Sequence, residues 1–243
     1  MQKYTLKEHF NELKKRFIRV ILAFFIGFGI SYYYSDDIYK IILHPLISVV
    51  DSASRKIIYT SLAEAFFSYI KISFFSALVI VFPLFVYQIY AFMKPGLHQG
   101  ERKILAFILF SSPVLFYSGC IFMFYFVMPS AWSFFLSYEK VSIGVPLVLE
   151  AKISEYLDLV VHLSVAFGLS FQLPVFMAIL SLMGVVNSSW LRNKRRLAIV
   201  IIFIVAAILT PPDVLSQIAL AIPLLLLYEL SIILCKLLEK REL

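Results

Sequence analysis

The sequence predicts an all-α integral membrane protein in which six transmembrane helices, several kinked by proline, form a cupped bundle with both termini in the cytoplasm. Three observations support this prediction. Of 243 residues, 61% are hydrophobic and only 15% are charged, and the mean hydropathy is +0.90. The apolar residues gather in long runs, and lysine and arginine concentrate between alternate runs. This pattern is typical of a multi-pass helical membrane protein.

The composition also excludes other classes of protein. A soluble protein of this length would have too small an interior to bury so many apolar side chains, so a soluble globular enzyme is excluded. Disorder needs low hydrophobicity, and a disulfide-rich secreted domain needs more than two cysteines. Cys120 and Cys235 both lie in apolar runs, where we expect small buried side chains.

Six apolar runs approach the roughly 20 residues that cross a hydrocarbon layer of about 30 Å. They cover residues 20–34, 72–93, 104–128, 157–186, 197–209 and 214–234. None alternates in the manner of a β-barrel strand, so a single helical membrane domain is expected over residues 1–243. The first run leads into bulky tyrosines rather than a small-residue cleavage site, so it is predicted to remain as a helix.

Prolines interrupt four of these runs. Pro83, Pro113, Pro174 and Pro223 fall inside the second, third, fourth and sixth runs. Each proline removes one backbone hydrogen bond and bends its helix. Four bent helices predict a curved, cupped wall rather than a parallel cylinder.

The fifth run is short, since the 13 residues of 197–209 reach only about 20 Å at 1.5 Å per residue. Either its basic flank from Arg192 to Arg196 snorkels while the bilayer thins, or the last two helices form a hairpin that does not fully cross. Between these helices, Thr210 and Asp213 have the spacing of a capping box around Pro211 and Pro212.

Two loops on the opposite side contain apolar segments. Residues 38–43 and 131–136 are too apolar to remain solvated, so they are predicted to form short interfacial helices that cap the bundle. Tyr39, Trp132, Phe134 and Phe135 are suited to the membrane interface.

The orientation follows from the basic residues. Sixteen of the 22 lysines and arginines lie in segments 1–19, 94–103, 192–196 and 236–241. Basic residues beside membrane spans stay in the cytoplasm, which predicts cytoplasmic termini. The net charge of +7 then faces anionic lipid, and it does not call for a nucleic acid.

The sequence contains no recognisable catalytic constellation. The four histidines have no metal-ligand spacing to one another or to a cysteine, and hydrolase or nucleotide-binding motifs are absent. The predicted protein is therefore not an enzyme and needs no metal or cofactor. Within the spans, four polar residues each require a partner, which is either an interhelical hydrogen bond, snorkelling to the interface or an incoming helix. They are Gln88, Gln172, Gln217 and Glu229.

Two cytoplasmic segments combine acidic and basic residues. His9 to Arg16 precedes the first span, and Pro95 to Arg102 joins the second span to the third. Each contains one carboxylate amid positive charge, Glu12 in the first and Glu101 in the second. Taken alone, either is a solvated surface charge, an ion-pair partner or a site for a cationic ligand.

Motifs in these segments resemble the TatC family, the signal-receptor subunit of the twin-arginine protein translocase. His9 to Arg16 is similar to the N-terminal His-Leu-x-Glu-Leu-Arg-x-Arg signature of that family. Further similar blocks follow in family order. They are Tyr87-Gln88, Phe92, Pro95-Gly96-Leu97 with Glu101-Arg102, Phe167-Gly168 to Pro174, Thr210 to Asp213 with Ser216-Gln217, and Leu227-Tyr228-Glu229.

The resemblance implies a function. TatC proteins bind the twin-arginine signal peptides of folded proteins and, with single-span TatA- and TatB-type partners, export them across the inner membrane using the proton-motive force. Self-association in the active complex is also implied. The implied signal-peptide residues are Glu12, Glu101, Lys14, Arg16, Phe92 and Arg102. The implied partner-docking residues are Gln172, Gln217, Glu229 and Asp213.

Two positions depart from the family pattern. Lys14 stands where arginine is common, which keeps the charge but loses the planar fork. Gln172 stands where many members have glutamate, so a mechanism that needs a buried negative charge is weakened there.

Two other functions fit parts of the sequence. A small-solute or ion transporter also has broken helices and intramembrane polar residues, but it favours an internal repeat, and loops 35–71 and 129–156 have no counterparts. An intramembrane enzyme lacks its catalytic groups.

Overall fold

The computed structural model describes residues 6–49, 58–96, 99–138, 140–142, 145–147, 150, 152–210 and 214–239. The first half contains α1 (Leu6–Tyr33), α2 (Ser35–Val49), α3 (Glu64–Met93), the 3-10 turn η1 (Lys94–Gly96) and α4 (Gln99–Phe122). A π-helical turn, η2 (Met123–Val127), leads into α5 (Met128–Leu136), and then follow α6 (Ile153–Ser170), α7 (Leu173–Leu182), α8 (Ser188–Asn193), α9 (Arg195–Leu209) and α10 (Val214–Glu239). Strands β1 (Lys140–Ser142) and β2 (Val145–Leu147) pair antiparallel, with Lys140 opposite Leu147.

Among the described residues, five helical stretches are long and apolar enough to cross a membrane. They are Phe10–Tyr33, Glu64–Met93, Arg102–Leu136, Ile153–Leu182 and Val214–Glu239. These stretches overlap the first, second, third, fourth and sixth predicted runs. Over the fifth run, α9 has 15 residues, or about 22 Å of helix. The chain is thus an all-helical, multi-pass membrane protein whose fifth predicted span is a markedly shorter helix.

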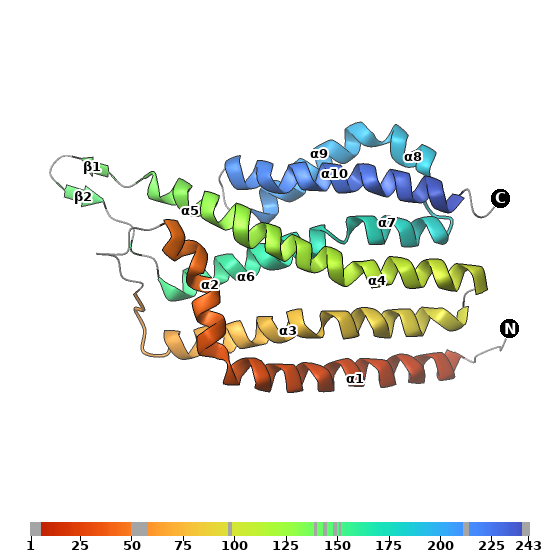
Figure 1. The fold of residues 1–243 in the computed structure, drawn as a ribbon, viewed down its shortest axis with the longest axis horizontal. Coiled ribbons are helices and arrows are strands. Elements are labelled where there is room, and N and C mark those ends of the chain that lie inside the picture. Colours follow the sequence, from red (N-terminus) through yellow and green to blue (C-terminus); the bar gives the residue numbers. More distant parts are fainter. Residues whose placement is uncertain are drawn as a thin grey trace.

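The long helices run side by side along the longest axis of the molecule (Figure 1). Helix α1 lies at one edge against α3, which contacts α4 and α6; α10 contacts α7, α8 and α9 at the other edge. Both ends of the chain lie at the same end of the bundle, as do η1 and the connection from α7 to α8 (Figure 1). Helix α2 and the β1–β2 hairpin lie at the opposite end.

Two helices extend further than the sequence predicts. Helix α1 begins at Leu6, so the basic segment before residue 20 is helical. Helix α4 continues through η2 into α5, so residues 131–136 end a long helix rather than forming a separate one. Residues 38–43 are helical within α2, as predicted. Trp132 packs inside the protein, because it is only 5% exposed and stacks on Tyr156 with ring centroids 5.3 Å apart. Its position at the membrane interface stays a prediction.

The prolines affect the helices in different ways. Pro83, Pro113 and Pro223 lie inside α3, α4 and α10. Pro174 instead stands in the first turn of α7, because α6 ends at Ser170 and a two-residue turn separates the two helices. The fourth predicted span is therefore broken at this point rather than bent around a proline inside one helix.

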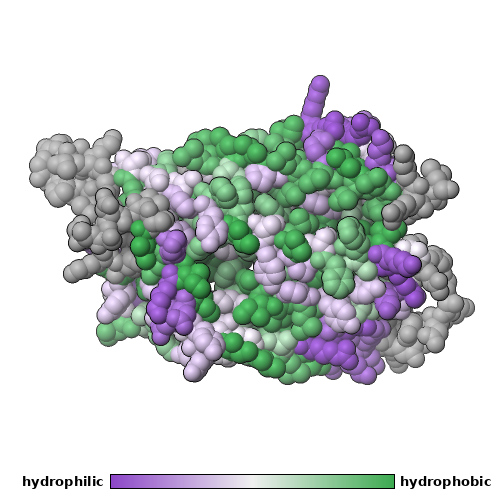
Figure 2. All heavy atoms as spheres, viewed as in Figure 1, coloured by the Kyte–Doolittle hydropathy of each residue, from purple (hydrophilic) through white to green (hydrophobic). Residues whose placement is uncertain are grey.

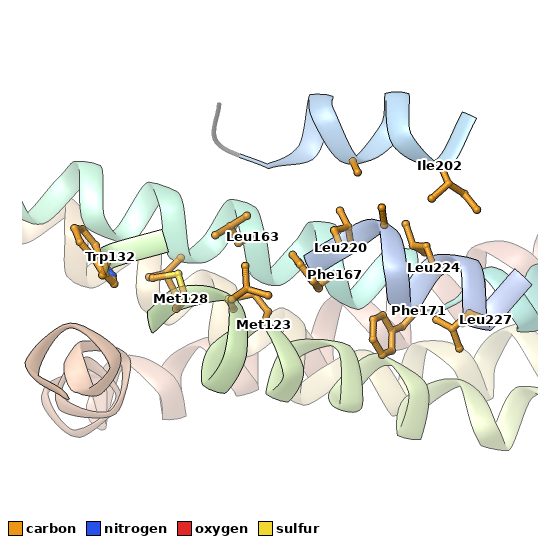
Figure 3. Packing of buried hydrophobic residues seen from close by; sticks show 14 of the residues in the cluster. Met123, Met128, Trp132, Leu163, Phe167, Phe171, Ile202, Leu220, Leu224 and Leu227 are labelled. Atoms are coloured by element: carbon orange, nitrogen blue, oxygen red, sulfur yellow. The ribbon is translucent and has the colours of Figure 1, made fainter. Parts of the chain in front are cut away.

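The larger core cluster lies mainly between the helices that follow α4 (Figure 3), and Ile42 and Leu46 of α2 and Ile72 of α3 join it. A smaller cluster packs α3 and α4 against α7. Met123, Leu163 and Phe167 are buried where the end of α4 meets α6, and Ile202 of α9 points toward Leu224 of α10 (Figure 3). The contact of α4 with α6 depends on two glycines. A Cβ atom at Gly119 would lie 2.7 Å from the carbonyl oxygen of Phe167, and one at Gly168 would lie 2.5 Å from the ring of Phe116. Larger residues at either position would push the helices apart.

The outer surface matches a lipid environment. Figure 2 shows hydrophobic residues over most of the visible face, with hydrophilic residues gathered mainly toward the two ends of the bundle. A hydrophobic surface between two hydrophilic ends is suited to contact with lipid chains rather than with water.

Candidate functional site

A polar cluster joins α1 to α3 at the end of the bundle that carries both termini. The Arg16 guanidinium donates through Nε to Glu12 Oε1 at 3.1 Å and through a second nitrogen to the same oxygen at 2.5 Å. Its remaining terminal nitrogen donates to Gln88 Oε1 at 3.3 Å. One guanidinium thus holds a carboxylate of its own helix and an amide of the neighbouring helix.

The local sequence explains this arrangement. Glu12 and Arg16 are four residues apart on a helix, so their side chains lie on the same face. Gln88 is 8% exposed, and a buried amide requires a hydrogen-bond partner. Gln88 lies near the end of α3, where the packing of α1 brings Arg16 within reach.

The geometry of Glu12 leaves room for another ligand. Both hydrogen bonds from Arg16 reach Oε1, and no other described residue donates to Oε2. The Glu12 side chain is 27% exposed, whereas that of Arg16 is 17% exposed. A carboxylate accepts planar guanidinium groups well, and Arg16 fixes its position. The cluster can therefore receive a second cationic group from the surface.

The other predicted signal-peptide residues lie on elements that share this end of the bundle (Figure 1). Lys14 is exposed on α1, Phe92 is half-buried one helical turn beyond Gln88, and Arg102 is half-buried on α4. The side chain of Glu101 lies outside the described part of the structure, so its role stays a prediction.

Gln172 forms a reciprocal pair with Ser112. The Ser112 hydroxyl donates to Gln172 Oε1 at 2.5 Å, and Gln172 Nε2 donates to the Ser112 carbonyl oxygen at 3.0 Å. This pair ties α4 to the turn between α6 and α7. Of the alternatives that the sequence left open for Gln172, the interhelical hydrogen bond is the one observed.

Two further polar residues connect α9 to α10. Arg195 donates to Glu229 Oε2 at 2.6 Å, and Gln217 Nε2 donates to the Phe203 carbonyl oxygen at 3.3 Å. Asp213 lies outside the described residues, so the predicted capping box is not tested. Thr210 is buried, and its hydroxyl donates back to the Ala206 carbonyl oxygen at 2.8 Å.

Sequence reasoning identified Gln88 as a glutamine that needs a hydrogen-bond partner, but it did not predict that Arg16 is this partner, and it did not identify Ser112 or Arg195 as partners. Gln88, Ser112 and Arg195 each complete a pair whose other member was predicted. The available signal was general, since any polar group in an apolar span needs a partner. Which partner it finds depends on how the helices pack. Among the described residues, no cluster of histidine, cysteine, aspartate and glutamate could hold a metal ion.

Comparisons with known proteins agree with this architecture. Residues 8–223 match the family model of the Sec-independent protein translocase protein (TatC). The chain is 55% identical over 239 residues to the Sec-independent protein translocase protein TatC of Rickettsia prowazekii, covering 98% of this chain and 95% of that one. It is 37% identical over 224 residues to the Escherichia coli K12 protein of the same name, covering 92% and 85%.

A solved structure extends the likeness to the fold. The crystal structure of a twin-arginine translocase receptor, TatC, superposes with a TM-score of 0.76 at 35% identity, covering 95% of this chain and 99% of that one. These descriptions name a translocase and its receptor rather than a catalytic enzyme. With a family model matched over most of its length and relatives aligned nearly end to end, the chain belongs to the TatC family of Sec-independent protein translocase proteins.

Proposed function

We propose that this chain is the receptor subunit of a twin-arginine translocase and that its Glu12–Arg16–Gln88 cluster contributes to the signal-peptide site. The observation that supports this most strongly is the Glu12 carboxylate, which Arg16 holds through one oxygen while the other accepts from no described residue. An arginine of the signal peptide would bind that second oxygen. Glu101 would supply a second carboxylate, with Lys14, Arg16, Phe92 and Arg102 completing the site.

The proposed orientation places this site in the cytoplasm. The four most basic segments of the sequence belong to the elements that gather at the end of the bundle with both termini (Figure 1). Positive charge beside membrane spans remains on the cytoplasmic side. In this proposal the protein resides in the inner membrane, α9 is the fifth of six crossings, and both termini are cytoplasmic.

The outer faces of α9 and α10 are the proposed docking surface for single-span TatA- and TatB-type partners. Ile208 of α9 is 72% exposed and Leu226 of α10 is 63% exposed. Helix α9 is shorter than a bilayer, so a partner helix packed here would relieve hydrophobic mismatch. Gln217 and Glu229 lie on α10 near this surface, and Gln172 and Asp213 complete the proposed polar set.

Export by this complex would be driven by the proton-motive force, with the folded substrate rather than a small solute as cargo. Self-association and contact with anionic lipid belong to the same proposal. The exposed apolar surface and the basic end of the bundle support these contacts.

A binding experiment tests the carboxylate assignment. Affinities of the detergent-solubilised protein for an Arg-Arg signal peptide and its Lys-Lys variant are measured by fluorescence anisotropy. Glu12→Ala and Glu101→Ala should each weaken Arg-Arg binding by about 1–3 kcal/mol, the scale of a charge-assisted hydrogen bond. The loss should be smaller with Lys-Lys, which has no planar fork.

Glu155→Ala is the matched control, because it removes an exposed carboxylate from the first turn of α6. It should leave the peptide affinity unchanged. If the Glu12→Ala, Glu101→Ala double variant binds the Arg-Arg peptide as tightly as the wild type, the two carboxylates are not the signal receptor.

A further inference from the structure

A groove of about 320 Å³ lies between α10 and the junction of α8 with α9, apart from the Glu12 cluster. Three basic side chains line it, Arg192 from α8, Arg195 from α9 and Lys236 from α10, together with the carboxylate of Glu229. The lining therefore contains three cations and one anion. Such an excess of positive charge in a groove favours an anionic ligand.

The charged groups of the groove are not equally engaged. Arg195 is held by Glu229 at 2.6 Å, which uses part of a guanidinium that has five N–H donors. Arg192 and Lys236 are exposed, and neither forms an ion pair with another described residue. Glu229 is thus a positioning residue for Arg195, and the remaining donors are available to a bound anion.

The rest of the groove is apolar. Ile232 and Ile233 of α10 belong to its lining, because positions 229, 232, 233 and 236 share one helical face. Leu237 of α10 also lines the groove and is 56% exposed. A ligand with a charged head and hydrocarbon chains would satisfy both parts of the surface, whereas a free anion would leave the apolar part unused.

We infer that this groove binds the phosphate headgroup of an anionic glycerophospholipid, with its acyl chains along the apolar residues of the groove, Ile233 and Leu237 of α10. Arginine forks and a lysine ammonium suit phosphate oxygens. Basic pockets between membrane helices are suited to anionic headgroups.

Lipid retention tests this inference. The protein is reconstituted in vesicles of equal parts phosphatidylcholine and phosphatidylglycerol, extracted with detergent, and its retained lipids are counted by native mass spectrometry. The wild type should retain phosphatidylglycerol in preference to phosphatidylcholine. The Arg192→Gln, Arg195→Gln, Lys236→Gln variant should lose at least about tenfold in phosphatidylglycerol retention.

The matched control removes the same charge elsewhere at this end of the bundle. Lys15→Gln, Arg19→Gln, Lys94→Gln changes three exposed residues of α1 and η1 and should retain lipid like the wild type. An equal loss in this control would show diffuse surface attraction and overturn the site. Displacement of phosphatidylglycerol by excess inorganic phosphate would show a free-anion site and overturn the lipid inference.

A second variant guards against misfolding of the first. Leu237→Glu adds a carboxylate at an exposed position in the lining of the groove and leaves the three cations and the Arg195–Glu229 pair intact. It should also lower phosphatidylglycerol retention, and wild-type retention in this variant would contradict the proposal. No signal peptide enters the measurement, so this inference and the proposed receptor function can fail independently.

Discussion

Single residues decide how polar groups are accommodated inside this apolar bundle. The guanidinium of Arg16 donates hydrogen bonds to both Glu12 and Gln88, and Gln172 both donates to and accepts from Ser112. Each pairing links two helices and leaves the engaged atoms without need of water. Since an unpaired polar group in hydrocarbon is costly, these pairs specify which helices are neighbours. An amide suits Gln172 because the site needs one donor and one acceptor.

Gln172→Glu should therefore make stability depend on pH at this site. The neutral acid can still donate to the Ser112 carbonyl oxygen and accept from the Ser112 hydroxyl. The ionised carboxylate has no proton to donate, so the carbonyl oxygen of Ser112 loses its partner. Because folding then favours the protonated form, stability should fall as pH rises, by about 1–3 kcal/mol once the group is ionised. Thermal unfolding in detergent over a pH series measures this effect. A pH dependence identical to that of the wild type would contradict the assigned pairing.

At the scale of helices, the sequence predicts which segments form helices better than it predicts where each helix begins and ends. Apolar runs and basic flanks indicated every membrane-spanning stretch, and residues 38–43 were correctly predicted to be helical. The continuation of α4 into α5 and the break between α6 and α7 were not predicted, because both depend on packing between helices distant in sequence. The candidate site shows the same limit. Glu12 and Arg16 share a helical face that the sequence reveals, whereas Gln88 is 72 positions from Arg16.

The effect of a proline inside a helix also depends on the neighbouring helix, which can supply the hydrogen bond that the proline cannot donate. Pro83 has no N–H to donate to the Val79 carbonyl oxygen, and the Tyr117 hydroxyl from α4 donates to that oxygen at 3.0 Å. Tyr117→Phe should thus lower the free energy of unfolding by about 0.6–2 kcal/mol, as expected for an interhelical hydrogen bond. In a Pro83→Ala background, the backbone N–H of residue 83 can donate to the Val79 carbonyl oxygen. Tyr117→Phe should then lower the free energy of unfolding by less.

A double-mutant cycle by thermal unfolding separates these contributions. Tyr125→Phe serves as the control, because Tyr125 is exposed on the adjoining turn η2, and its loss of a hydroxyl should change stability little. Equal costs of Tyr117→Phe with and without Pro83 would show that the hydroxyl does not replace the missing donor.

At the scale of the whole molecule, the proposed topology has an even number of passes, and the short helix α9 is one of them. The chain returns to the end at which it started (Figure 1), and five long stretches alone would leave its termini at opposite ends. In the proposed topology, α9 makes the remaining pass with about 22 Å of helix against roughly 30 Å of hydrocarbon. The edge formed by α9 and α10 therefore combines exposed apolar side chains with an unmatched length of bilayer.

Lengthening α9 tests whether that mismatch matters to function. Four apolar residues inserted after Val205 add about 6 Å and remove most of the mismatch. If partner helices associate with α9 and α10 because association relieves strain, the lengthened protein should copurify with fewer partners and export a twin-arginine substrate more slowly. The control exchanges Ile204 and Val205 for leucine at unchanged length and should behave as the wild type. Assembly with partners and export at the original rate by the lengthened protein would show that shortness is incidental, and the proposed docking at α9 and α10 would be wrong.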